Sequence, residues 1–156
     1  MQTNEKLTEV LNDLIEINND RVKGYEKAVE ETKDLDVDLQ AIFHSMANDS
    51  RKYAAELTQE VNKLGGESTR DTTTSGKIYR AWMDVKAAFS GHDRQSVLES
   101  CEFGEDAAQK AYTTALASDA EISADVRQLI TGQQATLKIA HNLIKKYRDL
   151  HHAVSA

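Results

Sequence analysis

The feature that most constrains the fold is the absence of proline from all 156 residues. Average usage of roughly 5% would place about eight prolines in a chain of this length. Because proline breaks helix interiors and punctuates turns and strand edges, its absence predicts long, uninterrupted helices. The length fits a single core, so we expect one domain over residues 1–156.

Composition excludes several classes of protein. Hydrophobic residues make up 40% of the chain and charged residues 29%, which argues against intrinsic disorder. The net charge of −7, with lysines and arginines interleaved with acids, argues against a nucleic-acid partner. No run approaches the 18 or so apolar residues that span a bilayer, and the first residues lack the apolar core of a secretory signal. One cysteine, Cys101, suits a reducing compartment, so we expect a cytoplasmic protein without a membrane partner.

Hydrophobic periodicity predicts an all-α fold. Asp36 and Ser123 are suitable N-caps, as is Thr3 or Asn4, and the pair Gly65-Gly66 is a suitable helix stop. Four long helices with a long middle connection form a four-helix bundle with a crossover, and a short extra helix lies between helices two and three. The predicted helices cover about 4–33, 36–64, 76–89, 94–117 and 123–152.

Polar residues interrupt the apolar seams near the middle of each long helix. The seam of the first helix is Leu7, Leu11, Leu14, Asn18, Arg21, Tyr25 and Ala28. In the later helices, Ser50, Glu105 and Gln133 fall on seam positions, and Gln134, Lys138 and His141 form a stripe beside the last seam. Antiparallel packing brings these positions into one layer, in which a buried charge must be paired or hydrogen-bonded.

The spacing within this layer resembles the carboxylate metal site of ferritin-like proteins. Glu105 precedes Tyr112 by seven residues, and Asn18 and Tyr25 repeat that spacing. Ser50 to Tyr53 and Lys138 to His141 stand where the resemblance implies two Glu-x-x-His pairs. Of the six ligand positions, only Glu105 and His141 keep a ligand type, which is too few for a di-metal centre.

We therefore expect a metal-free layer with no catalytic residue. Its expected centre is a Glu105–Lys138 ion pair, and its members are Asn18, Ser50, Tyr53, Glu105, Lys138 and His141, with Arg21, Tyr25, Tyr112 and Gln134 in support. One alternative is iron or manganese bound through Glu105 and His141 with a shifted set of acids drawn from Glu26, Asp49 and Glu102. Another is a small polar or anionic ligand beside Arg21 and Lys138.

Four segments make the chain similar to a family called domain of unknown function 2383. This resemblance implies a ferritin-like fold in bacterial proteins without an assigned activity. The segments are 19–28 (NDRVKGYEKA), 76–86 (GKIYRAWMDVK), 98–108 (LESCEFGEDAA) and 111–116 (AYTTAL).

These observations favour a non-enzymatic bundle with a structural, stress-related or partner-binding role. The enzymatic alternative is a di-metal oxidase or an iron-handling protein that uses iron or manganese near Glu105 and His141. A homodimer is also expected, formed through the hairpin end of the second helix and the short helix that carries Trp82. The sequence identifies no other protein partner.

Overall fold

The computed structural model describes residues 2–32, 37–69 and 94–155. Its helices are α1 (Gln2–Thr32), α2 (Val37–Lys63), α4 (Arg94–Leu116) and α5 (Ala124–Ser155). These bounds confirm the four long predicted helices. The first helix already includes Thr3 and Asn4, so the N-cap predicted there is wrong; Gln2 is itself a good helix former. The Asp36 cap, the crossover and the helix over 76–89 with Trp82 lie outside the described residues.

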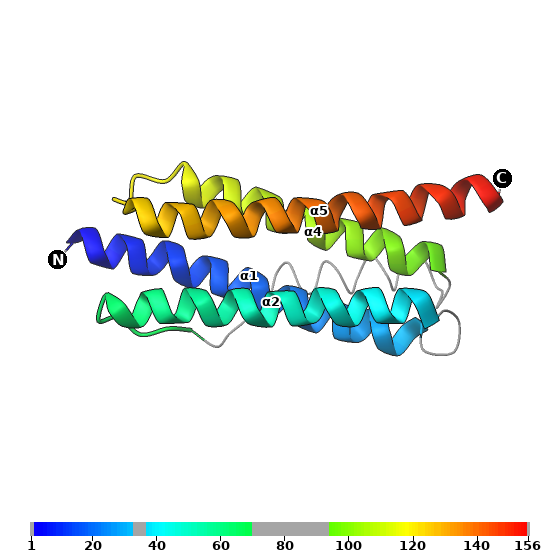
Figure 1. Ribbon diagram of the computed structural model, residues 1–156, viewed down its shortest axis with the longest axis horizontal. Coiled ribbons are helices and arrows are strands. Elements are labelled where there is room, and N and C mark those ends of the chain that lie inside the picture. Colours follow the sequence, from blue (N-terminus) through cyan, green and yellow to red (C-terminus); the bar gives the residue numbers. More distant parts are fainter. Residues whose placement is uncertain (1, 33–36, 70–93, 156) are drawn as a thin grey trace.

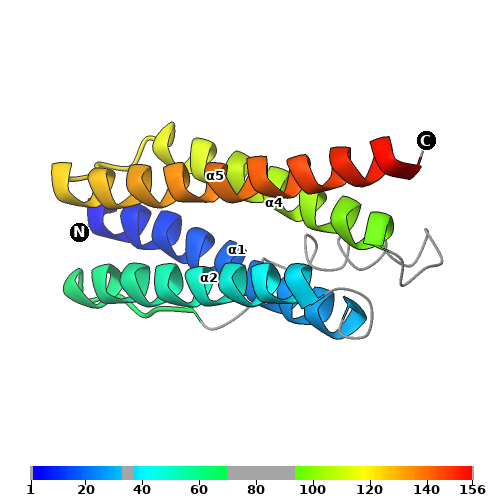
Figure 2. The same ribbon diagram turned by 45° about the vertical axis from the view of Figure 1, so that its right-hand side comes forward.

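The four helices form a bundle in which neighbours run antiparallel (Figures 1 and 2). α1 packs on α2 and on α4, and α5 packs on α4 and more sparsely on α2. α2 and α4 run in the same direction on diagonal corners, as do α1 and α5. Every helix therefore contributes its middle to the same cross-section of the bundle. Within the described ranges, no helix is both long and apolar enough to cross a membrane.

Local hydrogen bonds fix two of the helix ends. At the end of α2, Gly65 has a positive φ of 77°, and the N–H groups of Gly65 and Gly66 donate to the carbonyls of Asn62 and Val61 at 3.0 and 3.1 Å. This pair of bonds is a Schellman motif and confirms the predicted glycine stop. At the start of α5, Ser123 Oγ accepts from the Val126 N–H at 3.3 Å, which confirms the predicted cap.

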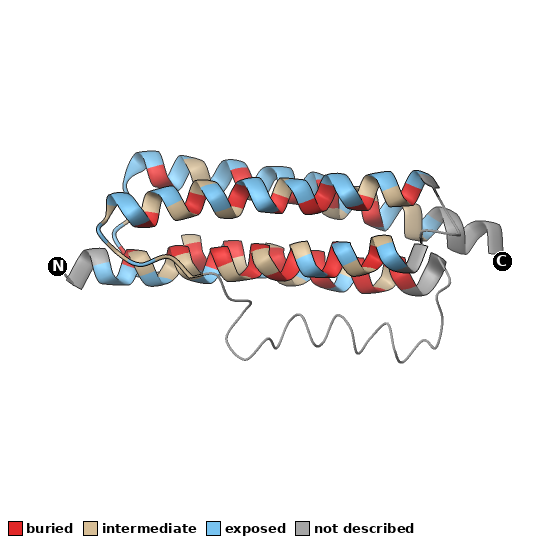
Figure 3. Cartoon of the chain, turned by 90° about the horizontal axis from the view of Figure 1, so that it is seen from below, coloured by how far each residue is buried: buried red, intermediate tan, exposed pale blue. Residues whose placement is uncertain are grey.

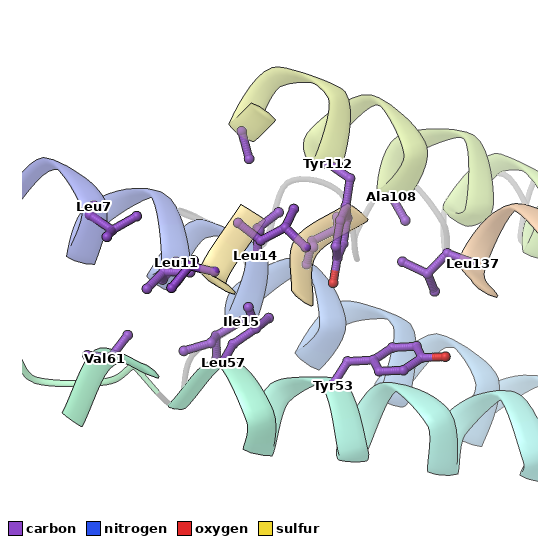
Figure 4. Close-up of a cluster of buried hydrophobic side chains, with 14 residues drawn as sticks. Leu7, Leu11, Leu14, Ile15, Tyr53, Leu57, Val61, Ala108, Tyr112 and Leu137 are labelled. Atoms are coloured by element: carbon purple, nitrogen blue, oxygen red, sulfur yellow. The ribbon is translucent and has the colours of Figure 1, made fainter. Parts of the chain in front are cut away.

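The buried side chains form two separate hydrophobic clusters along the bundle. Buried positions lie on the helix faces that turn toward one another (Figure 3). One cluster, shown in Figure 4, joins residues such as Leu11, Leu57 and Ile130. The other joins residues such as Phe43, Leu98 and Ile144. Between them lie buried polar residues from all four helices, which form the candidate site.

Candidate functional site

An ion pair between α1 and α4 forms the centre of the buried polar layer. Arg21 Nε donates to Glu105 Oε1 at 2.7 Å, and Arg21 Nη2 lies 2.5 Å from the same oxygen. The Tyr25 hydroxyl, one turn along α1, donates to that oxygen at 2.6 Å. The side chains of Arg21 and Glu105 are 1% and 0% exposed, so the protein alone must satisfy these charges.

A chain of hydrogen bonds continues from Arg21 through the other helices. Arg21 Nη1 donates to Ser50 Oγ on α2, and Ser50 Oγ donates to Asn18 Oδ1 on α1 at 3.0 Å. Asn18 Nδ2 donates to the Tyr112 hydroxyl on α4 at 2.8 Å, and that hydroxyl donates to Gln133 Oε1 on α5 at 2.7 Å. Figure 4 shows the Tyr112 side chain reaching from α4 into the space between the helices. One directional series of donors and acceptors therefore links all four helices.

The chain of hydrogen bonds ends on α2. Gln133 Nε2 donates to Glu56 Oε1 at 3.1 Å and to the Tyr53 carbonyl oxygen at 3.4 Å. Each of the buried groups needs its partner because an unpaired polar group in the core costs free energy. These buried groups are therefore all hydrogen-bonded only when α1, α2, α4 and α5 pack in one particular register.

Burial and charge set the protonation states in the layer. Burial by itself lowers the pKa of the Arg21 guanidinium, but the charges of Glu105 and Tyr25 and the hydrogen bonds to them together outweigh burial, so the net pKa is raised. Burial, followed by the charge of Glu105, raises the pKa of the Tyr25 hydroxyl. The same two causes raise the pKa of the Cys101 thiol. Arg21 is therefore a permanent cation, and the phenol and the thiol remain protonated at neutral pH.

The layer does not fit a di-metal centre. Glu105 Oε1 already faces three donors from Arg21 and Tyr25, and Glu105 Oε2 is buried with no hydrogen-bond partner among the described residues. That oxygen is available to a cation, but the guanidinium of Arg21 lies on the same carboxylate and repels a second positive charge. Asn18 and Ser50 supply neutral oxygens that are already engaged with each other.

The predicted Glu105–Lys138 ion pair is wrong. Lys138 is exposed on α5, whereas Arg21 holds the carboxylate. The physical reason is the rotation between neighbouring residues of a helix. Leu137 is the buried seam residue at 1% exposure, and Lys138, which follows it, points about 100° away around the helix axis. The alternative of an anionic ligand between Arg21 and Lys138 loses its second cation for the same reason.

The structure also separates the other predicted pair, Glu105 and His141. Glu105 points into the bundle, while His141 Nε2 lies 2.5 Å from Asp106 Oδ1 at the surface. Gln134 bonds to Thr113 on the exposed side of α4 and α5. Of the proposed additional acids, Glu26 pairs with Arg51 on the surface and Glu102 pairs with Arg148.

Several predicted site residues do meet in the layer. Those that the structure joins by hydrogen bonds are Asn18, Arg21, Tyr25, Ser50, Glu105 and Tyr112. The Tyr53 ring packs instead in the hydrophobic cluster of Figure 4, and only its carbonyl accepts from the layer. The predicted list of layer members omitted Gln133, although its seam position had placed it in the layer, and it omitted Glu56. The polar seam position of Gln133 was a usable signal, but Glu56 lies off the seam and gave none.

Comparison with known proteins finds one family model that matches most of the chain. No curated protein matches the chain. The family described as Domain of unknown function (DUF2383) matches residues 6–118, which include most of α1 and all of α2 and α4, and thus the Arg21–Glu105 ion pair. The chain belongs to the DUF2383 family.

Proposed function

We propose that this protein is a non-enzymatic helical scaffold with a structural or partner-binding role, whose polar core is held by Arg21 rather than by a metal. The observation that carries this proposal is the buried guanidinium on Glu105 Oε1. A fixed organic cation at this point supplies the positive charge that a carboxylate in a bundle core requires. It offers no exchangeable coordination position and no redox chemistry.

The arrangement of the remaining layer supports the same role. Tyr112 and Gln133 satisfy each other and their neighbours directly, so each hydroxyl and amide acts as a structural link. Buried polar networks of this kind specify which faces of helices meet. The alternative function, a di-metal oxidase or iron-handling protein acting through Glu105 and His141, has no geometry to support it because the two side chains face different environments.

The metal content of the wild-type protein, compared with that of Glu105→Gln, tests this proposal. Protein purified without a histidine tag is incubated with Fe(II) or Mn(II), desalted and analysed for metal, alongside Glu105→Gln. The proposal predicts the same metal content in the two proteins and no acceleration of Fe(II) oxidation by either. Metal that is retained in the wild-type protein and lost in a folded Glu105→Gln variant would contradict it.

A groove between α1 and α4 supports the partner-binding part of the proposal. The groove encloses about 750 Å³, and Phe103 on its wall is 40% exposed. Val10 and Ala111 extend the apolar wall, and Asp13 stands at its side. Burial, followed by the charge of Glu9, raises the pKa of the Asp13 carboxyl. Such a mixed surface suits another protein better than a small anion.

A second copy of the chain is the partner that can be tested directly. If the groove mediates self-association, the wild-type protein sediments as a concentration-dependent dimer and Phe103→Glu sediments as a monomer. A wild-type protein that stays monomeric at high concentration would exclude the homodimer and leave a different protein as the partner.

A further inference from the structure

Two carboxylates and an imidazole meet on the outer surface between α4 and α5. Glu102 and Asp106 are one helical turn apart on α4, and His141 faces them from α5. The three potential ligand atoms lie within 4.8 Å of one another. Within the part of the chain that the structure describes, no other group of three or more such side chains meets this criterion. We propose that Glu102, Asp106 and His141 bind one divalent transition-metal ion.

The chemistry of the three ligands selects the class of ion. Imidazole nitrogen suits Fe(II) and Zn(II) better than Mg(II) or Ca(II), and the two carboxylates also suit Mn(II). The side chains of Glu102 and His141 are 14% and 20% exposed, whereas that of Asp106 is 63% exposed. The first two are held in place by packing, and the open side at Asp106 admits water as the remaining ligands.

Movements of less than about 2 Å bring the three ligand atoms, all within 4.8 Å of one another, to the spacing that an ion requires. In octahedral geometry, metal–ligand bonds of about 2.0–2.2 Å place adjacent ligand atoms about 3 Å apart. The Asp106 and His141 atoms are now 2.5 Å apart and share a hydrogen bond, so they must separate by roughly 0.5 Å. The exposed Asp106 side chain can make this adjustment without disturbing the core.

Arg148 supplies a built-in competitor for the ion. Its Nη1 contacts Glu102 Oε2, while its Nε and Nη2 donate to Asp149 at 3.2 and 2.8 Å. A metal ion that binds the Glu102 carboxylate displaces Arg148, which keeps its hydrogen bonds to Asp149. The competition predicts that removal of the guanidinium tightens metal binding, an effect opposite in sign to removal of a ligand.

This site is independent of the scaffold proposed above, since it uses neither Arg21 nor Glu105. The test uses Mn(II) alone with the untagged full chain, and follows free Mn(II) by electron paramagnetic resonance. We expect the wild-type protein to bind one ion per chain. We expect Asp106→Asn and His141→Ala each to bind Mn(II) at least about tenfold more weakly than the wild-type protein does. Both residues are at the surface, and circular dichroism verifies that each variant remains folded.

Matched variants separate this site from other sources of binding. The exposed His44 on α2 serves as a histidine control in His44→Ala, and the double variant His151→Ala with His152→Ala removes the adjacent histidines near the end of α5. Neither is expected to change the affinity. Glu105→Gln is expected to leave binding unchanged as well.

Charge variants provide a second readout. Arg148→Met should tighten Mn(II) binding several-fold, and more than Lys146→Met, which removes the same charge from the same helix. Mn(II) should also raise the thermal midpoint of the wild-type protein but not of His141→Ala, because binding to the folded state stabilises it.

Three results would overturn the inference. These are no Mn(II) binding by the wild-type protein at millimolar concentrations, unchanged binding in both Asp106→Asn and His141→Ala, or loss of binding in the double variant of His151 and His152. Binding that is lost in Glu105→Gln and retained in the two surface variants would contradict both this inference and the metal-free core. Binding lost only in the surface variants supports the inference and leaves the scaffold proposal standing.

Discussion

Replacement of Arg21 by methionine should strongly destabilise the fold. The change removes a side chain that is 1% exposed and leaves the Glu105 carboxylate, 0% exposed, with the Tyr25 hydroxyl as its one remaining donor among the described residues. It also removes the donor to Ser50. An uncompensated charge of this kind costs about 3–5 kcal/mol. With an unfolding entropy of about 2.1 cal/mol/K per residue, the thermal midpoint of this chain should fall by about 9–15 °C.

The surface pair of Arg51 and Glu26 is a matched control. Its N–O distance is 2.5 Å, the same as in the buried pair, but its side chains are 48% and 55% exposed. Arg51→Met should therefore cost less than about 1 kcal/mol. The assay is urea denaturation followed by circular dichroism, with unfolding free energies extrapolated to water.

A double-mutant cycle separates charge from packing. Glu105→Leu added to Arg21→Met removes the stranded carboxylate, so the double variant should recover much of the loss. Two outcomes would refute the reasoning: a cost for Arg21→Met no larger than that for Arg51→Met, or losses from the two core substitutions that simply add.

Three further predictions concern alkaline pH, glycine and a helix cap. Burial, the largest cause, raises the pKa of the Tyr25 and Tyr112 hydroxyls, so their contribution to stability is fully present below pH 10 or so. Above that pH the tyrosines of the unfolded chain ionise first, and the free energy of unfolding should fall by up to about 1.4 kcal/mol per pH unit for each tyrosine. Denaturation at several pH values should show that the unfolding free energy of Tyr25→Phe falls less steeply than that of the wild-type protein. An equal fall in the two proteins would count against the buried phenol. Gly65→Ala should destabilise the protein by about 1 kcal/mol because φ at this position is +77°. Gly132→Ala should stabilise it by a similar amount, because Gly132 lies in α5 and no atom is near the added Cβ. Melting temperatures that shift in the same direction in both variants would contradict the backbone argument. Ser123→Ala should cost about 1 kcal/mol through loss of the α5 cap, and an unchanged melting curve would show that the cap is dispensable.

Hydrophobic periodicity was sufficient to predict the four described helices and the seam positions that form the buried layer. The seam positions Asn18, Arg21, Ser50, Glu105 and Gln133 are all buried, because side chains three and four residues apart share a helix face. Periodicity specifies which residues face the core, and this is a property of each helix alone.

The partner of Glu105 could not be obtained from that pattern alone. The resemblance to a ferritin-like ligand set placed Lys138 in the layer, one position past the buried Leu137 and therefore off the seam. The sequence pattern had also placed Arg21 on the seam. Which of two cations contacts a carboxylate on another helix, however, depends on the rotation of the helices and on the length of the side chain. The contacts of Glu102 and Asp106 across α4 and α5 depend on the same interhelical geometry.

Anomalous diffraction tests the central claim, that Arg21 occupies the cation position of the layer, most directly. Crystals grown with Mn(II) would be measured at the manganese edge, with the map examined around Glu105. We predict guanidinium density on Glu105 Oε1 and no anomalous peak within coordination distance of either carboxylate oxygen. An anomalous peak on Glu105, with Arg21 displaced from the carboxylate, would contradict the account.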